Sequence, residues 1–120
     1  MIDHIGTIQL KDMVFFARHG CFAEERTIGN KFIVNLSLTA DVKAASESDH
    51  LEDAVNYQEV YRYVKEEMDI PSNLLEHVAA RILKAVKKAF PEIREMTVTI
   101  DKLNPPIGGQ VYASSVTMSL

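Results

Sequence analysis

Hydrophobic and polar positions alternate along four stretches of the chain and follow a helical spacing along two others. The alternation predicts strands at about Ile8–Ala17, Phe32–Thr39, Met96–Lys102 and Val111–Leu120. Between the second and third of these, apolar residues recur at helical spacing from Asn56 to Met68 and again from Leu74 to Phe90. Pro71 and Pro91 end these helices, because the residue before a proline avoids the helical conformation. The predicted order is two strands, two helices and two strands.

The two faces of the predicted strands differ in chemistry. On the third strand Val98 and Ile100 share one parity with Lys102, so an ammonium group extends along the face that must bury its apolar residues. The opposite faces carry small polar side chains, namely Asn35, Ser37, Thr39, Thr97, Thr99, Ser115, Thr117 and Ser119. An ordinary solvent-exposed face carries more Lys and Glu. The pattern fits a wet, enclosed surface such as the inside of an assembled barrel, and it fits the strand propensity of threonine equally well.

Length and charge restrict the class of protein. The 120 residues predict a single domain spanning residues 1–120. A formal net charge of -4 argues against nucleic-acid binding as the main task. No apolar stretch approaches the length of a membrane span, so we expect no membrane association. The single cysteine, Cys21, cannot form an internal disulfide, which favours a reducing, cytoplasmic location.

Lys102 is the first candidate for chemistry. It ends a predicted strand and is followed by a loop, residues 103–109, that is stiff at Pro105 and Pro106 and flexible at its glycines. A lysine held beside such a loop is well placed for proton transfer. The alternative is that the ammonium group simply extends to solvent from the strand end.

Three further segments could contribute to a site. The loop at residues 18–30 is too long for a tight hairpin and carries Glu25, which taken alone predicts a solvated carboxylate. Tyr57, at the start of the first helix, taken alone predicts a core aromatic residue. Glu76 follows Asn73 by three positions, a spacing that predicts a capping box at the second helix. The four histidines are scattered singly, without the spacing of a zinc site, so we predict no metal.

Several of these residues belong to a set that occurs along nearly the whole chain. The set consists of His19-Gly20, Glu25, Ile28-Gly29, Val55–Tyr57, Leu74–His77 and Lys102–Ile107. In this order the motifs resemble those of the dihydroneopterin aldolase family. The resemblance implies the α+β tunnelling fold (T-fold), ββααββ, with an antiparallel four-stranded sheet and two helices on one face. It also implies subunits that assemble into a barrel, usually a homo-octamer of two stacked tetrameric rings, with the polar sheet faces lining the tunnel.

The resemblance further implies a reaction and the residues that carry it. The family cleaves 7,8-dihydroneopterin by a retro-aldol step to 6-hydroxymethyl-7,8-dihydropterin and glycolaldehyde, in tetrahydrofolate biosynthesis. The C=N bond of the dihydropterin accepts the electrons, so neither a cofactor, a metal nor a Schiff base is needed. Lys102 matches the catalytic acid/base, and Tyr57 matches a tyrosine that reaches the substrate from the neighbouring subunit and relays a proton. Glu76 and the backbone of Leu75 match the groups that bind the pterin ring, and Glu25 matches a substrate-contacting carboxylate.

Two alternative functions stay open on the sequence. Asp101–Leu103 and Ser114–Leu120 are also similar to dihydroneopterin triphosphate 2'-epimerase, which shares the fold and the lysine. The run Asn104–Ile107 favours the aldolase, and a triphosphate would prefer more basic loops. Epimerisation of the side chain is expected as a side activity, because the same intermediate can reclose on its other face. A non-catalytic pterin-binding T-fold protein would not need the full set of acid/base residues.

Overall fold

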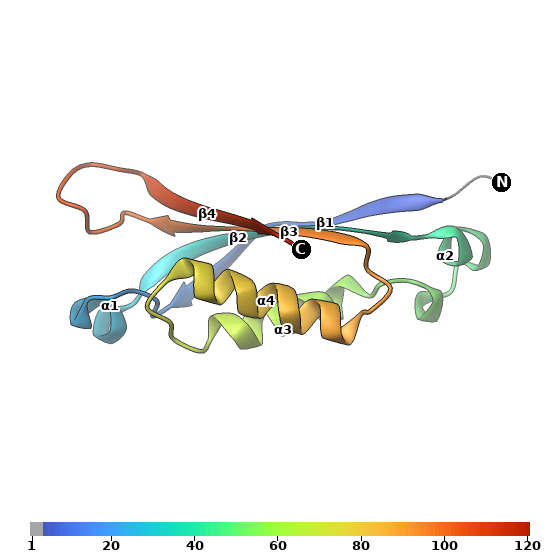
Figure 1. Cartoon of the computed structure of the whole chain (residues 1–120), viewed down its shortest axis with the longest axis horizontal. Helices are drawn as coiled ribbons and strands as arrows, with labels where there is room; N and C mark the ends of the chain where they lie inside the picture. The colour runs from blue at the N-terminus through green and yellow to red at the C-terminus, as the bar shows by residue number, and fades with distance from the viewer. Residues whose placement is uncertain (1–3) are drawn as a thin grey trace.

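The computed structural model describes residues 4–120; Met1–Asp3, part of the expected domain, lie outside the described residues. Figure 1 shows the two long helices side by side on one face of a twisted sheet. In chain order the elements are β1 (Ile5–Ala17), α1 (Ala23–Ile28), β2 (Asn30–Asp41), α2 (Lys43–Ser48), η1 (Leu51–Asp53), α3 (Tyr57–Met68), α4 (Leu75–Ala89), β3 (Glu95–Leu103) and β4 (Ala113–Ser119).

The strands form one antiparallel sheet in the order β1-β2-β3-β4. This confirms the α+β class and the order of two strands, two long helices and two strands. The short elements α1, α2 and η1 were not predicted, because segments of six residues or fewer are too short to show a periodicity. The fourth strand begins at Ala113 rather than at Val111 as predicted.

A β-bulge in β1 keeps the apolar side chains of that strand on one face. The pairing with β2 shifts between Leu10 and Met13. At the bulge Asp12 has a φ of 53°, and its N–H donates to the side-chain oxygen of Asn35 at 2.8 Å. Leu10 and Met13 have opposite parity in the sequence, and the extra residue turns both toward the helices.

The core lies between the sheet and the helices α3 and α4. Its buried residues include Phe32, Val34, Val98 and Ile100 from the sheet and Val64, Val78, Ile82 and Val86 from the helices. The other face of the sheet carries the small polar side chains, with hydrogen bonds between Thr97 and Ser119 at 2.9 Å and between Thr99 and Thr117 at 2.8 Å. Within residues 4–120, no helix is both long and apolar enough to span a membrane.

Candidate active site

An ion pair between Lys102 and Glu25 lies at the end of the helix-covered face. Lys102 opposes the fully buried Phe32 across β2 and β3, so its side chain follows the core face as its parity predicted. Its Nζ donates to Oε1 of Glu25 at 2.8 Å, and each of the two side chains is only 12% exposed. The alternatives of an ammonium extended to solvent and of a solvated Glu25 are therefore wrong. An amine this enclosed needs a counter-charge, and α1 provides it.

Both oxygens of the Glu25 carboxylate have donors. Oε1 accepts from Lys102, and Oε2 accepts from the backbone N–H of Phe22 at 3.1 Å. Burial by itself would raise the pKa of Glu25, but the hydrogen bond from Lys102 and those from the backbone of Phe22 and Cys21 outweigh it and lower the pKa. The carboxylate is thus an anion with a fixed orientation, and it holds the ammonium group of Lys102 in place.

Gly20 makes room for this carboxylate. A Cβ atom at Gly20 would lie 2.2 Å from Oε2 of Glu25, and the residue has a φ of +154°. Any larger residue would therefore push the carboxylate away from Lys102. This explains physically why glycine follows His19 in the motif.

The ion pair lies in a cleft of about 300 Å³ that Leu75 and Glu76 also line. Four segments form this cleft: the turn and helix that lead to Glu25, the start of α4, the end of β3 with the loop after it, and the start of β4. Among the described residues, the carboxylate of Glu76 makes no hydrogen bond or ion pair, so its oxygens are available to a ligand. In the first turn of α4 the N–H of His77 donates to the carbonyl of Leu74 at 3.2 Å, whereas that of Leu75, at the first helical position, has no partner inside the helix. Four of the five predicted site residues therefore meet in one cleft.

Tyr57 is the predicted site residue that does not line this cleft. It is the first residue of α3 and is 59% exposed, so the alternative of a core aromatic residue is wrong. The side chain of Asn56 caps this helix by accepting from the N–H of Gln58 at 3.0 Å. The 12 residues of α3 extend over roughly 18 Å, and α4 starts next to the far end of α3 (Figure 1). Tyr57 and the start of α4 therefore lie at opposite ends of α3.

The predicted capping box at α4 is wrong. The helix starts one residue later than the capping box requires, with Leu74 at the cap position and no side-chain hydrogen bond to the first turn. The side-chain oxygen of Asn73 accepts a hydrogen bond from Arg26 instead. Because Glu76 has no capping role, its oxygens do not have to serve two purposes.

Several residues that line the cleft were not among the predicted site residues. They are Cys21, Phe22, Ile107, Ser114 and Val116. Ser114 and Val116 lie on β4, where Ser114 pairs with Lys102 and Val116 with Ile100. The register of β3 and β4 could have identified these two residues, but a sequence alone does not fix a register across the loop at residues 104–112. Among residues 4–120 there is no group of three or more His, Cys, Asp or Glu side chains that could hold a metal ion.

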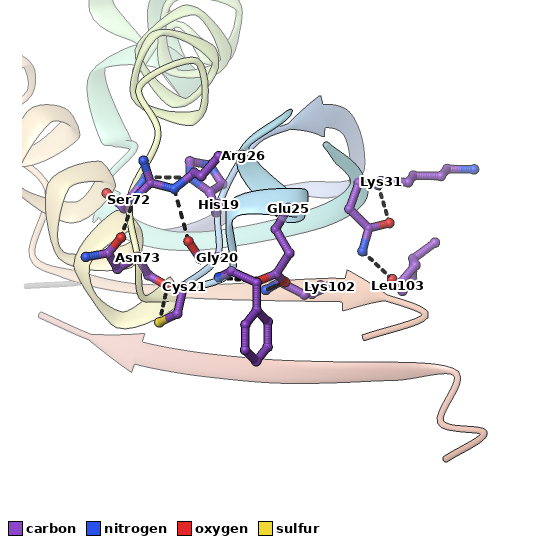
Figure 2. A network of polar contacts seen from close by, with 12 residues as sticks. His19, Gly20, Cys21, Glu25, Arg26, Lys31, Ser72, Asn73, Lys102 and Leu103 are labelled. Carbon is purple, nitrogen blue, oxygen red and sulfur yellow. Dashed lines mark hydrogen bonds and ion pairs between the residues drawn. The ribbon is translucent and has the colours of Figure 1, made fainter. Parts of the chain in front are cut away.

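His19 anchors the segment before Glu25 (Figure 2). Its ring is 1% exposed, packs edge-on against Phe32 at 5.2 Å between centroids, and accepts from the N–H of Ser72 at 3.1 Å. Burial, with a further contribution from the charge of Arg81, lowers the pKa of His19 to about 4. His19 is therefore a neutral hydrogen-bond acceptor at neutral pH.

This lowered pKa predicts a loss of stability in weak acid. The unfolded chain binds the proton from about pH 6.5 downward, whereas the folded chain binds it only near the pKa of about 4. The free energy of unfolding should therefore fall by about 3 kcal/mol between those pH values. Urea unfolding at pH 7.5 and pH 4.5 measures the loss. His19→Asn keeps an acceptor without a titrating ring and should flatten the dependence, whereas His50→Asn, at an exposed histidine, should keep it. If the free energy of unfolding of His19→Asn depends on pH as strongly as that of the wild type, His19 is not the source of the loss in acid.

Comparisons with known proteins agree with this geometry. The model of the family described as dihydroneopterin aldolase matches residues 8–119. A dihydroneopterin aldolase of Staphylococcus epidermidis is 43% identical over 103 residues, which cover 85% of each chain. One of Streptococcus pyogenes is 38% identical over 112 residues, or 92% of this chain and 94% of the relative. In fold, the chain is similar to E. coli dihydroneopterin aldolase in complex with neopterin, with a TM-score of 0.87, 17% identity and coverage of 96% of this chain and 98% of that one.

Proposed function

The chain belongs to the dihydroneopterin aldolase family of folate biosynthesis enzymes, with the tunnelling fold, and we propose that it cleaves 7,8-dihydroneopterin by a retro-aldol reaction. The products are 6-hydroxymethyl-7,8-dihydropterin and glycolaldehyde. The observation that carries the proposal is the Lys102–Glu25 ion pair, 2.8 Å long and largely enclosed, in the same cleft as the unpaired carboxylate of Glu76.

Because the ring C=N bond accepts the electrons, the protein has to supply only proton transfers from groups held in fixed positions. A proton leaves the hydroxyl on the second side-chain carbon, the bond between the first and second carbons breaks, and the electron pair moves into the ring C=N bond. The enamine-like intermediate then takes a proton on the first carbon and becomes the hydroxymethyl product. Lys102 is the acid/base for these transfers, Glu25 sets its position and balances its charge, and the hydroxyl of Tyr57 relays a proton.

Glu76 binds the pterin ring in this proposal. A carboxylate accepts two parallel hydrogen bonds from the 2-amino group and the adjacent ring N–H, and the backbone of Leu75 adds a further contact. Glu76→Gln replaces one carboxylate oxygen by an NH₂ group, which would face an N–H donor of the pterin. We expect the dissociation constant for neopterin to rise by about 30-fold or more, since breaking a charged hydrogen-bonded pair costs at least ~2 kcal/mol. Fluorescence titration measures it. Glu92→Gln, at an exposed carboxylate outside the cleft, should bind as the wild type does, and equal weakening in both variants would refute the role of Glu76.

The site requires a second subunit, because Tyr57 lies outside the cleft of its own chain. Within residues 4–120, β1 and β4 are the edges of the sheet, each paired on one side. Edge strands of this kind can pair with another copy, and the small polar sheet face would then line the tunnel of a homo-octamer. The cytoplasmic location stays a prediction from the single cysteine.

Product analysis of purified protein with 7,8-dihydroneopterin tests the proposed function. We expect glycolaldehyde and 6-hydroxymethyl-7,8-dihydropterin in equal amounts, without added metal or cofactor. The same analysis detects the side-chain epimer that the intermediate would give by reclosing on its other face. If the protein binds neopterin but releases no glycolaldehyde, it is a pterin-binding protein and the proposed reaction is wrong.

A further inference from the structure

The two walls of the cleft come from segments far apart in the chain. One wall carries the Lys102–Glu25 pair, and the other carries Leu75 and Glu76 at the start of α4. The stretch at residues 19–26, which leads to the first wall, touches the connector at residues 69–74, which leads to the second. Gly20 donates its N–H to the carbonyl of Ser72 at 2.9 Å, and the N–H of Ser72 donates to His19 at 3.1 Å.

The guanidinium group of Arg26 joins the same two segments through its side chain. Its Nε donates to the carbonyl of Gly20 at 3.0 Å, and its Nη2 donates to the side-chain oxygen of Asn73. Figure 2 shows Arg26 reaching Gly20 and Asn73, while the neighbouring Glu25 reaches Lys102. A planar guanidinium with donors in fixed directions sets both distance and angle between its partners.

Arg26 is not one of the residues that line the active-site cleft. It lines an adjacent cavity together with Ser72, Asn73 and His77, and Asn73 borders both this cavity and the cleft. The connector is also held from its other side, because Arg81 donates to the hydroxyl of Ser72 and to the carbonyl of Ile70, each at 2.8 Å. With the connector fixed to α4 in this way, Arg26 acts together with the hydrogen bonds of His19 and Gly20 to Ser72 in setting where the stretch at residues 19–26 lies relative to it.

We propose that Arg26 is a positioning residue for the reaction, which fixes the wall that transfers protons relative to the wall that binds the pterin ring. The inference rests on the proposed function. The ring is held by Glu76 on one wall, whereas the side chain that breaks must meet Lys102 on the other. A displacement of the walls by about 1 Å leaves ring binding intact but costs up to ~10²-fold in the chemical step.

Arg26→Met tests the inference, because methionine keeps much of the apolar stem and removes every donor. We expect kcat for glycolaldehyde release to fall about 10- to 100-fold, while the dissociation constant for neopterin changes less than about threefold. Arg18→Met is the matched control: Arg18 lies in the same region but, among residues 4–120, its side chain donates only to the carbonyls of Arg26 and Thr27. An equal loss of kcat in Arg18→Met would show general loosening of the loop and would overturn the proposal.

A double-mutant cycle with Asn73→Ala measures whether the effect of Arg26 on kcat passes through its contact with Asn73. A merely structural role would not produce this coupling. If Arg26 acts through Asn73, the double variant should lose no more kcat than the more impaired single variant, whereas independent effects would multiply. If the losses in kcat multiply in the double variant, the positioning role of Arg26 is wrong. The same holds if Arg26→Met keeps full kcat while the wild type is active. Either result leaves the proposed function standing. Absence of glycolaldehyde release by the wild type in the same assay overturns the proposed function instead.

Discussion

Lys102→Ala should bind neopterin nearly as well as the wild type and release almost no glycolaldehyde. The substitution removes the amine that lies 2.8 Å from Glu25 in the cleft and leaves Leu75 and Glu76 in place. Because a positioned acid/base group contributes about 10²- to 10⁴-fold, we expect kcat to fall by that factor. Single-turnover cleavage of 7,8-dihydroneopterin and a binding titration with neopterin measure the two effects separately.

Lys31→Ala is the matched control for this variant. Lys31 is an exposed lysine on β2, directly before Phe32, the residue that opposes Lys102. Its loss removes one positive charge at the same end of the sheet without touching the cleft, so we expect wild-type cleavage. If Lys102→Ala retains more than about a tenth of wild-type kcat, Lys102 is not the acid/base.

Mixed assemblies should recover activity that two inactive variants lack. Tyr57 lies outside the cleft of its own chain, whereas Glu76 lines it. We expect Tyr57→Ala and Glu76→Ala each to lose at least ~10²-fold in kcat/KM, since one loses a proton relay and the other the ring anchor. When both variants are coexpressed and assemble at random, about a quarter of the clefts combine an intact Tyr57 with an intact Glu76. Activity should return to about a quarter of the wild-type value per site.

A second pair of variants provides the control for this mixing experiment. Glu76 and Lys102 line one cleft of the same chain. Coexpression of Glu76→Ala with Lys102→Ala should therefore recover nothing, because every cleft lacks one of the two groups. Recovery in this pair, or none in the pair with Tyr57→Ala, would contradict a site shared between subunits in the proposed way.

The sequence predicted the long elements and the direction of Lys102 because both follow from local periodicity. Lys102 shares the parity of Val98 and Ile100, and one buried face is enough to fix where its side chain points. The partner of Lys102 could not be found in this way. Glu25 lies 77 residues away in the sequence, on the six-residue helix α1, inside a segment that the sequence predicts to be a loop. Only the resemblance to a family connected the two.

A prediction from local spacing was wrong where a side chain makes a long-range contact instead. Asn73 and Glu76 have the spacing of a capping box, but the side chain of Asn73 binds Arg26, 47 residues earlier in the chain. The cap position then falls to Leu74, which has no side-chain acceptor. Tyr57 was misjudged on its position alone for a related reason. Its exposure fits the proposed contact with a second subunit, and the periodicity of one chain carries no information about a second.

The most direct measurement is a crystal structure of the assembled protein with neopterin bound. The proposal predicts the pterin ring on the carboxylate of Glu76 and the backbone of Leu75, with a side-chain hydroxyl within hydrogen-bond distance of Nζ of Lys102. The hydroxyl of Tyr57 from a second subunit should close the same cleft. Neopterin on the polar face of the sheet near Asn35, or a cleft in which Lys102 does not reach the ligand, would contradict the proposal.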